Sequence, residues 1–309
     1  MAQDPENLQA PLKEGLDAAR AARRRQRLLE KVAQEALAIE REEAREAGEL
    51  GYMARILVQC TMPHRDPKGP LFRRSNGHFE LTMMAPRGLP FGKIPRLLLA
   101  WTTTEAVRTK NRTLQLGDTL SGFMGQLGLI PTGGRWGSIT RLRSQAKRLY
   151  SSTISAILND ERRGEWEEQG FRLADSTSLW WDPRSPDQIA LYGSTVTLTQ
   201  DFFESITRRP VPVDMRALKV LRSPLALDLY TWLTYRFSYL RHETEIPWEA
   251  LELQFGADYK ETRAFKFRFL QRLRDVLKLY PSARVAEGSS GLILKPSPTH
   301  VAKLTAPRS

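Results

Sequence analysis

The sequence predicts an α+β protein, mainly helical, in which one arrangement of elements occurs twice behind a long charged N-terminal helix. Three observations lead to this prediction: an N-terminal stretch of strong helix formers, a pattern of three helices and two strands in the middle of the chain, and a second such pattern near the C-terminus. The 309 residues allow two or three domains. We expect an N-terminal helix or arm (1–50), a first domain (51–200), a connector (201–222) and a second domain (223–309).

The composition restricts the class of partner. A formal net charge of +12 and a pI of about 10.0 favour a polyanion, either nucleic acid or an anionic membrane surface. The longest apolar run, Leu97–Trp101, is far shorter than the ~18 residues that span a bilayer, and the N-terminus shows no secretion signal. Cys60 is the single cysteine, which suits a reducing compartment. We therefore expect a cytoplasmic protein without a membrane partner.

The first fifty residues differ in composition from the rest. From residue 12 to residue 49 there is no proline, and Ala, Leu, Glu and Arg predominate, so we predict one long helix. Arginines crowd its front half and glutamates its back half. A solvated charged helix is the favoured interpretation, while an oligomerisation arm and a basic arm that grips a nucleic-acid backbone stay open. Its narrow apolar stripe consists of Leu29, Val32, Ala36 and Ile39.

The first copy of the repeated pattern begins after an irregular, proline-containing stretch. Alternating polar and apolar side chains predict its first strand, and Asp118 and Gly128 are the expected N-cap and stop of a short helix. A turn rich in Asp, Pro and Ser separates its last two strands. The predicted elements are a strand over 78–83, helices over 95–109, 118–127 and 138–158, and strands over 171–181 and 189–198.

The second copy repeats the order of helices and hairpin beyond the connector, in which Pro210 and Pro212 restrict the backbone. Ser223 as N-cap and Pro224 at the first helical position predict the start of its first helix. A helix, a short helix, a long helix and a β-hairpin form the layout of a winged helix-turn-helix, so we predict two such domains in tandem. The predicted elements are helices over 223–240, 247–255 and 260–279 and strands over 284–287 and 292–295.

The long helix of the first copy has an apolar face and a basic face. At about 100° per residue, the apolar positions 139, 142, 146, 149, 153 and 157 cluster opposite a set of Arg, Lys and Ser side chains. A recognition helix needs this division, because Arg reads guanine and Lys or Ser holds phosphates. A glycine-rich segment before the helix lets the backbone approach a partner closely. The candidate DNA-binding residues are Arg135, Trp136, Ser138, Arg141, Ser144, Lys147 and Arg148.

The long helix of the second copy has the same polarity. Phe267 lies on its basic side, where it either packs against a neighbouring element or contacts a thymine methyl. Two independent helices with this pattern indicate a protein that binds double-stranded DNA. The candidate DNA-binding residues of this copy are Lys260, Arg263, Lys266, Arg274 and Lys278.

Catalysis finds little support in the sequence. The histidines are isolated, without the spacing of metal ligands, and the glycine-rich segments lack the pattern of a P-loop. A strand-nicking enzyme would need a pair of histidines near a tyrosine such as Tyr150, and that pair is missing. Cys60 is interpreted as a small apolar core residue. We therefore expect no enzymatic activity, no metal and no cofactor.

Several motifs resemble the RepA-type family of plasmid replication initiators, over about residues 53–298. In the first copy they are Gly92-Lys93-Ile94-Pro95-Arg96, Ala100-Trp101, Glu105-Ala106-Val107-Arg108-Thr109, Leu116-Gly117, Gly133-Gly134-Arg135-Trp136-Gly137 and Arg148-Leu149. In the second copy they are Ser223-Pro224-Leu225-Ala226-Leu227-Asp228, Trp232-Leu233, Phe255-Gly256 and Tyr280-Pro281.

The resemblance implies a bacterial protein that binds repeated sites in a plasmid origin and helps to open the duplex. It also implies host replication partners such as the chromosomal initiator and the replicative helicase, a homodimer in some roles, and repression of its own promoter. The residues alone predict duplex binding without catalysis, and replication rests on the resemblance. A two-winged-helix transcriptional regulator is the main alternative, and a nicking relaxase is a more distant one.

Overall fold

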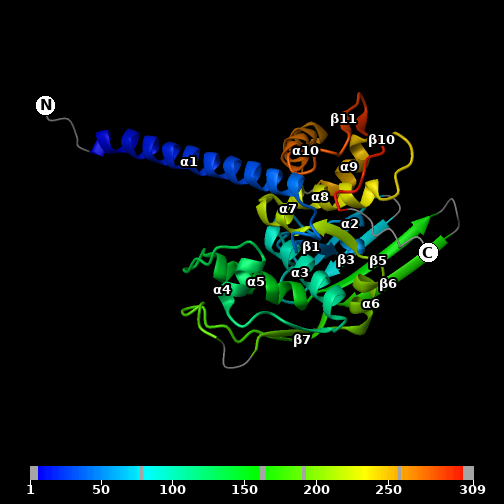
Figure 1. Ribbon diagram of the computed structural model, residues 1–309, viewed down its shortest axis with the longest axis horizontal. Coiled ribbons are helices and arrows are strands. Elements are labelled where there is room, and N and C mark those ends of the chain that lie inside the picture. The colour runs from blue at the N-terminus through cyan, green and yellow to red at the C-terminus, as the bar shows by residue number, and fades with distance from the viewer. Residues whose placement is uncertain are drawn as a thin grey trace.

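The structure is a computed structural model that describes residues 6–76, 79–160, 165–189, 193–256, 259 and 261–301. A long helix, α1 (Glu6–Arg41), projects from a body that holds all other elements (Figure 1). The helix was expected to continue to residue 49, but it ends at Arg41, and a turn follows in which Gly48 adopts a left-handed conformation with φ of 68°. The backbone N–H of Glu49 donates to the carbonyl of Ala44 there, which directs the chain into the first strand.

The first copy contains the three predicted helices and its last two predicted strands, and a further strand that was not predicted joins these two in a three-stranded antiparallel sheet. Thr119, and not the expected Asp118, caps the short helix, because its hydroxyl accepts a hydrogen bond from the N–H of Gly122 at 3.0 Å. The last strand of the copy lies in the middle of the sheet, in the order β4-β8-β7. The elements are α3 (Lys93–Thr109), β4 (Thr113–Gln115), α4 (Leu120–Gln126), α5 (Ser138–Tyr150), β7 (Ala174–Ser178) and β8 (Thr195–Leu198).

The prediction of a helix over 138–158 is wrong in its second half. The helix ends at Tyr150, where the hydroxyl of Ser152 donates to the carbonyl of Leu149 at 2.6 Å. The residues that follow form a strand, because Thr153, Ile154 and Ile157 are β-branched and find partner strands on both sides. The apolar positions 153 and 157 therefore belong to this strand and not to the helix.

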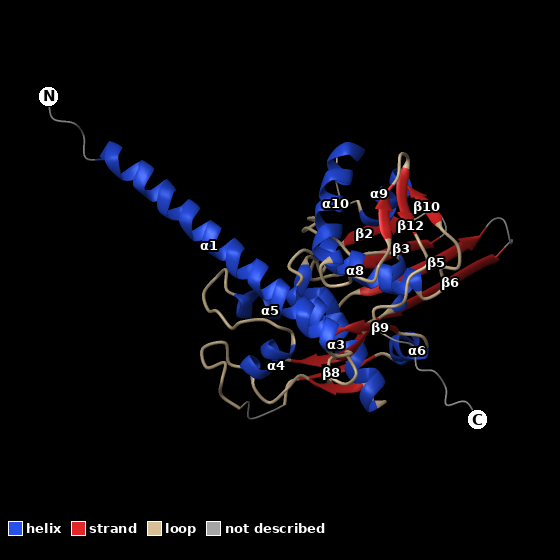
Figure 2. Ribbon diagram, turned by 45° about the horizontal axis from the view of Figure 1, so that its top comes forward, coloured by secondary structure: helices blue, strands red, loops and turns tan. Residues whose placement is uncertain are grey.

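A hairpin of two strands is thus inserted between α5 and the last two strands of the first copy. It joins the strand expected over 78–83, which is confirmed over Phe79–Met84, while His78 lies outside the described residues. The four antiparallel strands extend away from the free end of α1 (Figure 2). They are, in sheet order, β2 (Leu71–Ser75), β3 (Phe79–Met84), β5 (Thr153–Asp160) and β6 (Glu165–Arg172).

The insertion also divides the strands that were predicted beyond residue 170. The run expected over 171–181 is split at Leu173 between β6 and β7, and Trp180 and Trp181 lie beyond the strand. The run expected over 189–198 is a strand only from Thr195, with residues 190–192 outside the described part.

The second copy repeats the topology of the first. Its helix starts after Ser223 with Pro224 in the first turn, as predicted, and its C-terminal hairpin is confirmed. The sheet order β10-β12-β11 matches β4-β8-β7 element for element. The short strand β10 was not predicted. The elements are α8 (Pro224–Phe237), β10 (Thr244–Pro247), α9 (Trp248–Phe255), α10 (Thr262–Leu277), β11 (Val285–Glu287) and β12 (Gly291–Leu294).

The segment expected to connect the copies is folded and packed. It contains α6 (Gln200–Arg208), β9 (Val211–Asp214) and α7 (Met215–Val220), whose buried side chains include Val213 and Leu218. Strand β9 pairs in antiparallel fashion with β1 (Leu50–Met53), which precedes the short helix α2 (Arg55–Gln59). The division of the chain into units at 50, 200 and 222 stays a prediction.

A buried ionic cluster joins the first helices of the two copies. Arg96 on α3 donates from Nε to Oδ1 of Asp228 on α8 at 2.6 Å and from Nη2 to Oδ2 at 2.7 Å. His64, in the segment after α2, lies with Nε2 at 2.7 Å from the same Oδ2. Three backbone carbonyls accept the remaining guanidinium protons, so Arg96 is fully paired although it is buried.

This cluster fixes the charges of its members. Burial opposes the ionisation of Asp228, but the Arg96 charge and the hydrogen bonds from His64 and Arg96 hold the pKa of the carboxyl below its ordinary value. Burial lowers the pKa of His64 despite the hydrogen bond to Asp228. A neutral His64 therefore donates to an ionised Asp228 between the two copies.

Candidate nucleic-acid interface

Helix α5 presents the predicted apolar and basic faces. Ile139, Leu142, Ala146 and Leu149 are buried in the core. On the opposite face Arg141, Ser144 and Lys147 are exposed. The exposed part of the helix therefore offers a guanidinium, a hydroxyl and an ammonium group along one side, as contacts to bases and phosphates require.

Two of the candidate residues on this helix are engaged within the fold. The Nη1 of Arg148 donates to the carbonyl of Leu89 at 3.1 Å and lies 3.3 Å from a carboxylate oxygen of Asp66, and the guanidinium lies over the ring of Phe91. The hydroxyl of Ser138 is buried and donates to the carbonyl of Ile130 at 2.6 Å. Arg148 therefore holds the loop before α3, and Ser138 closes the loop before α5.

The loop between α4 and α5 carries Arg135 and Trp136 at its tip. The side chain of Trp136 is 79% exposed, and the guanidinium of Arg135 lies 5.1 Å from the centre of its ring. A side chain at Gly137 would meet the carbonyl oxygen of Thr132 at 2.2 Å, so only glycine allows this close turn. The loop thus holds an exposed cation and an exposed aromatic ring beside the N-terminus of α5.

Helix α10 repeats this division in the second copy. Phe265, Phe269, Leu273 and Val276 are buried. Arg263, Arg274 and Lys278 are exposed, and Phe267 lies among them with its side chain 64% exposed. The prediction that Phe267 stands on the basic side is confirmed.

Lys266 and Lys260 differ from the other candidates on α10. The Nζ of Lys266 lies 2.8 Å from a carboxylate oxygen of Glu287 on β11 and 4.8 Å from the ring centre of Trp248. This lysine therefore ties the helix to the hairpin and to α9. Lys260 lies outside the described residues.

The remaining candidate cations lack carboxylate partners. Within the described part of the chain, no carboxylate oxygen lies within 4.0 Å of the charged nitrogens of the six exposed candidates. Exposed cations without partners keep their counterions until a polyanion displaces them, which favours binding to nucleic acid. The six are Arg135, Arg141, Lys147, Arg263, Arg274 and Lys278.

The potential catalytic side chains are in inert surroundings. Burial raises the pKa of the Cys60 thiol to about 12, and its Sγ lies 3.3 Å from the carbonyl of Phe79. Burial also raises the pKa of Tyr150 to about 12, and its hydroxyl is hydrogen-bonded to Thr102. Among the described residues, no group of three His, Cys, Asp or Glu side chains could hold a metal ion.

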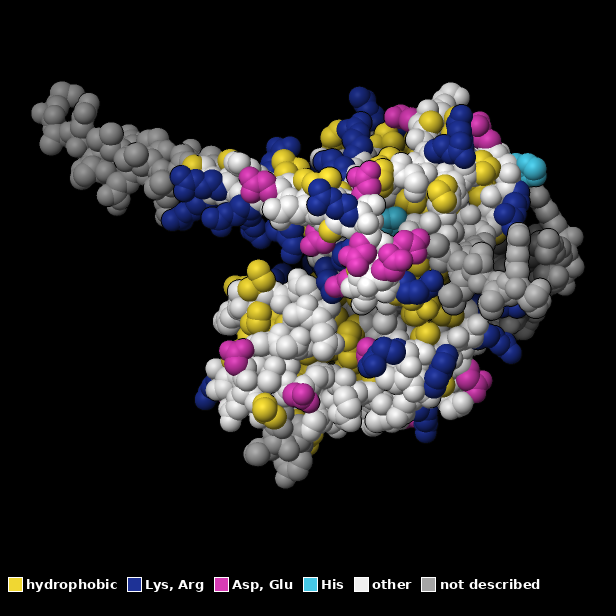
Figure 3. Space-filling model, in the orientation of Figure 1, with side chains coloured by type: hydrophobic (Ala, Val, Ile, Leu, Met, Phe, Trp, Pro, Cys, Tyr) yellow, Lys and Arg dark blue, Asp and Glu magenta, His cyan; other side chains and the backbone are white. Residues whose placement is uncertain are grey.

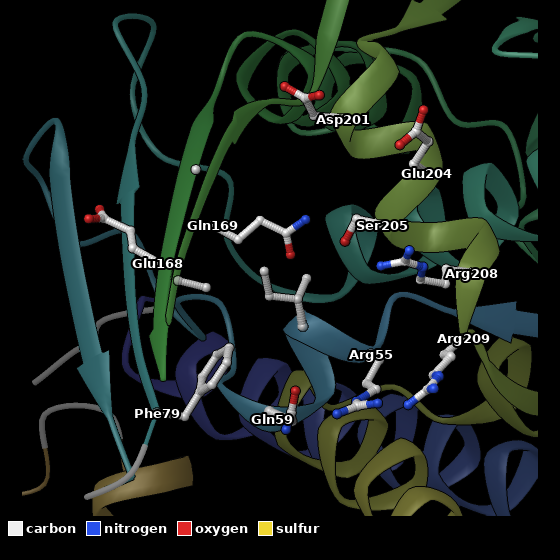
Figure 4. A pocket seen from close by; sticks show the side chains of 13 residues that line it. Arg55, Gln59, Phe79, Glu168, Gln169, Asp201, Glu204, Ser205, Arg208 and Arg209 are labelled. Atoms are coloured by element: carbon white, nitrogen blue, oxygen red, sulfur yellow. The ribbon is translucent and has the colours of Figure 1, made fainter. Parts of the chain in front are cut away.

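A cavity lies between α2, α6 and the four-stranded sheet (Figure 4). It has a volume of about 660 Å³, and Arg55 and Arg209 also line an adjoining cavity of about 250 Å³. In Figure 4 the side chains of Asp201 and Glu204 project from α6, on a different side of the cavity from Arg55 and Arg209. Its lining contains both acidic and basic side chains but no histidine that could act as a base for the Ser205 hydroxyl, and none of the described carboxylates forms a group of three that could hold a metal ion.

A family model agrees with the resemblance of the sequence to plasmid replication initiators. The chain matches the family described as "Plasmid encoded RepA protein" over residues 89–249, more than half of its length. A crystal structure of domain 2 and domain 3 of RctB is similar over 76% of this chain and 95% of that chain, with 13% identity and a TM-score of 0.47. The search of curated proteins gave no match. No helix in the described residues is long and apolar enough to cross a membrane.

The family match covers α5 and the buried Arg96–Asp228 pair but not α10. It begins just before α3 and ends within α9, so it contains α5, its loop and both partners of the Arg96–Asp228 pair. Helix α10 and the C-terminal hairpin lie beyond it. On this match, the chain belongs to the family of plasmid-encoded RepA proteins.

Proposed function

We propose that this protein initiates plasmid replication by binding repeated duplex sites in the plasmid origin through two winged helix-turn-helix modules. Helix α5 is the recognition helix of the first module and α10 that of the second. The family membership supports the role in plasmid replication, and the two basic helices support the binding of duplex DNA.

One observation carries the proposal. Two segments without obvious sequence identity have the same order of helices and strands, and the same strand order in the sheet. In both, the third helix buries an apolar stripe and exposes cations that lack carboxylate partners. That helix is the one which a winged helix-turn-helix places in the major groove.

The joint between the modules favours a fixed spacing of the two helices. The Arg96–Asp228 pair joins α3 to α8, and the segment α6–β9–α7 contacts α3 through α6 and α8 through β9. Recognition helices on one face of a duplex are spaced by about one helical turn, ~34 Å, so we expect the modules to read adjacent stretches of one site. In this arrangement Arg141 and Arg263 contact bases or phosphates in different halves of the site.

We further propose that the protein acts in the cytoplasm without a catalytic step, a metal or a cofactor. Its expected protein partners are the host chromosomal initiator and the replicative helicase. A homodimer and repression of its own promoter are further expectations of this role.

The most direct test is a footprint of the full-length protein on DNA that flanks its own gene. We expect protection of several similar repeats, and maintenance of a small replicon that carries this DNA only when the protein is supplied. Protection at the promoter alone, without such maintenance, would indicate a transcriptional regulator instead. An even, unspecific protection would contradict both functions.

A further inference from the structure

The middle of α1 carries a stripe of cations on one side of the helix. Arg20, Arg24, Arg27 and Lys31 are spaced by three or four residues, so their side chains lie above one another on a single face. All four are exposed, and the sequence from residue 18 to residue 29 contains no acid. Among the described carboxylates, that of Asp17 lies within 4.0 Å of a cation of this stripe, at 3.8 Å from Arg20.

The back half of α1 is fixed to the body. The Nη2 of Arg216 donates to the carbonyl of Glu42 at 2.8 Å, and Nη1 donates to that of Ala38 at 3.3 Å. Just beyond the helix, Lys219 forms an ion pair with Glu49 at 2.8 Å. Val32, Ala36 and Ile39 pack against the core. The part of α1 that carries the stripe of cations therefore extends from the body as a stiff arm (Figure 1).

The arm leaves the body next to both proposed recognition helices. In Figures 1 and 2, α10 lies on one side of α1, and α4 and α5 lie on the other. Figure 3 shows Lys and Arg side chains along the side of α1 that faces the part of the body with α4 and α5. A duplex bound to either helix would therefore pass close to the arm.

The inner end of the stripe lies near a cation of the body. Lys93 begins α3, and its Nζ donates to the carbonyl of Lys219 at 2.9 Å. Burial, the charge of Arg222 and the charge of Lys31 lower the pKa of Lys93 to about 8. Lys31, at the inner end of the stripe, therefore lies near Lys93, and none of the described carboxylates pairs with Lys93.

We infer that this face of α1 is a third DNA-binding element, which holds the phosphates of one strand beside the stretch that α5 and α10 read. From Arg20 to Lys31 the helix rises by about 16 Å, the rise of roughly five base pairs, so successive cations can follow a duplex backbone. Guanidinium groups also match phosphate oxygens in geometry. The inference rests on the proposed function, because it needs a duplex bound to the two modules.

The test compares full-length variants on the site found by footprinting. Replacing Arg20, Arg24 and Arg27 together by Ala should reduce affinity roughly 10- to 100-fold at low salt, and should reduce the slope of log K against log salt by about two to three. Protection should shrink at the flank of the site and persist in its centre. Replacing the same three residues by Lys should restore the slope, because the charges are retained.

Single variants of two adjacent arginines give the matched control. Arg24 lies in the stripe, while Arg25 is rotated by about 100° from Arg24 around the helix axis, away from the stripe. Arg24→Ala should therefore lower the slope by about one unit, whereas Arg25→Ala should leave it nearly unchanged. Circular dichroism confirms that α1 stays helical in both variants.

The possible failures can be told apart. If the wild type gives no specific footprint, the proposed function is wrong. If it gives one, and the triple Ala variant keeps the same slope and footprint, the inference about α1 is wrong. A triple Ala variant with an unchanged slope and a lost dimer in sedimentation would assign the stripe to a second copy of the chain and overturn the inference.

Discussion

Replacing Asp228 by Asn removes the charge that holds the two copies together, with little change in shape. The carboxylate accepts two hydrogen bonds from Arg96 and one from His64, all at 2.6–2.7 Å. An amide offers one acceptor oxygen, and its NH₂ group would face an N–H of Arg96 or His64. Arg96 would then be a buried cation without its counterion, a change that typically costs about 3–5 kcal/mol.

Urea unfolding at pH 7 of the wild type and of Asp228→Asn measures this cost. The control is Asp175→Asn, because Asp175 pairs with Arg112 at the surface, where the side chains are 52% and 44% exposed. Such a pair contributes less than about 1 kcal/mol, so the control should unfold almost like the wild type. Equal stabilities of the two variants would refute the reasoning that the buried pair joins the copies.

The same cluster predicts a pH dependence. The pKa of His64 is lower in the folded protein than in the unfolded chain, so the unfolded chain binds more protons below about pH 6.5. Stability should therefore fall as the pH is lowered from 7 towards 5, and His64→Gln should weaken this dependence. A profile that His64→Gln leaves unchanged would assign the effect to other groups.

Three further predictions concern the proposed DNA-binding faces and α1. Replacing Arg141 and Lys147 together by Ala should leave the melting temperature unchanged but weaken DNA binding by about 1–3 kcal/mol per lost base contact, in fluorescence anisotropy titrations. Replacing Arg263 and Arg274 by Ala should remove protection from the other half of the footprint, and identical footprints of the two double variants would contradict adjacent reading. Deleting residues 1–28 should leave thermal melting unchanged, whereas deleting a further seventeen should lower it, because two carbonyl acceptors of Arg216 are lost with them.

The sequence predicted the elements whose signals are local. Ser223 and Pro224 mark the start of α8, and the glycine-rich hairpin signal marks β11 and β12. The strand β5 was missed because Thr153 and Ile157 continue the helical period of α5 by coincidence. Its partner β3 is distant in the sequence, and its partner β6 lacks a clear alternation of polar and apolar residues. Only the folded chain brings the three strands together.

For the candidate site, the sequence predicted which side chains are exposed but not which of them form ion pairs within the fold. The helical period placed Arg141, Lys147 and Arg274 on exposed faces, because exposure follows from the apolar stripe on the opposite side. It could not place Arg148 against Asp66 or Lys266 against Glu287, since these partners lie 82 and 21 positions away along the chain. Such pairs depend on tertiary packing, for which a single sequence carries no local signal.

The Arg96–Asp228 pair also sets an order of events during synthesis. The two residues are 132 positions apart, and a ribosome that adds about 5–20 residues per second needs on the order of 7–26 s to pass from one to the other. Throughout that interval the guanidinium of Arg96 has no carboxylate from α8 to meet and stays hydrated. During synthesis, the side of α3 that carries Arg96 therefore stays exposed to water. It is covered only after α8, the first helix of the second copy, has been synthesised.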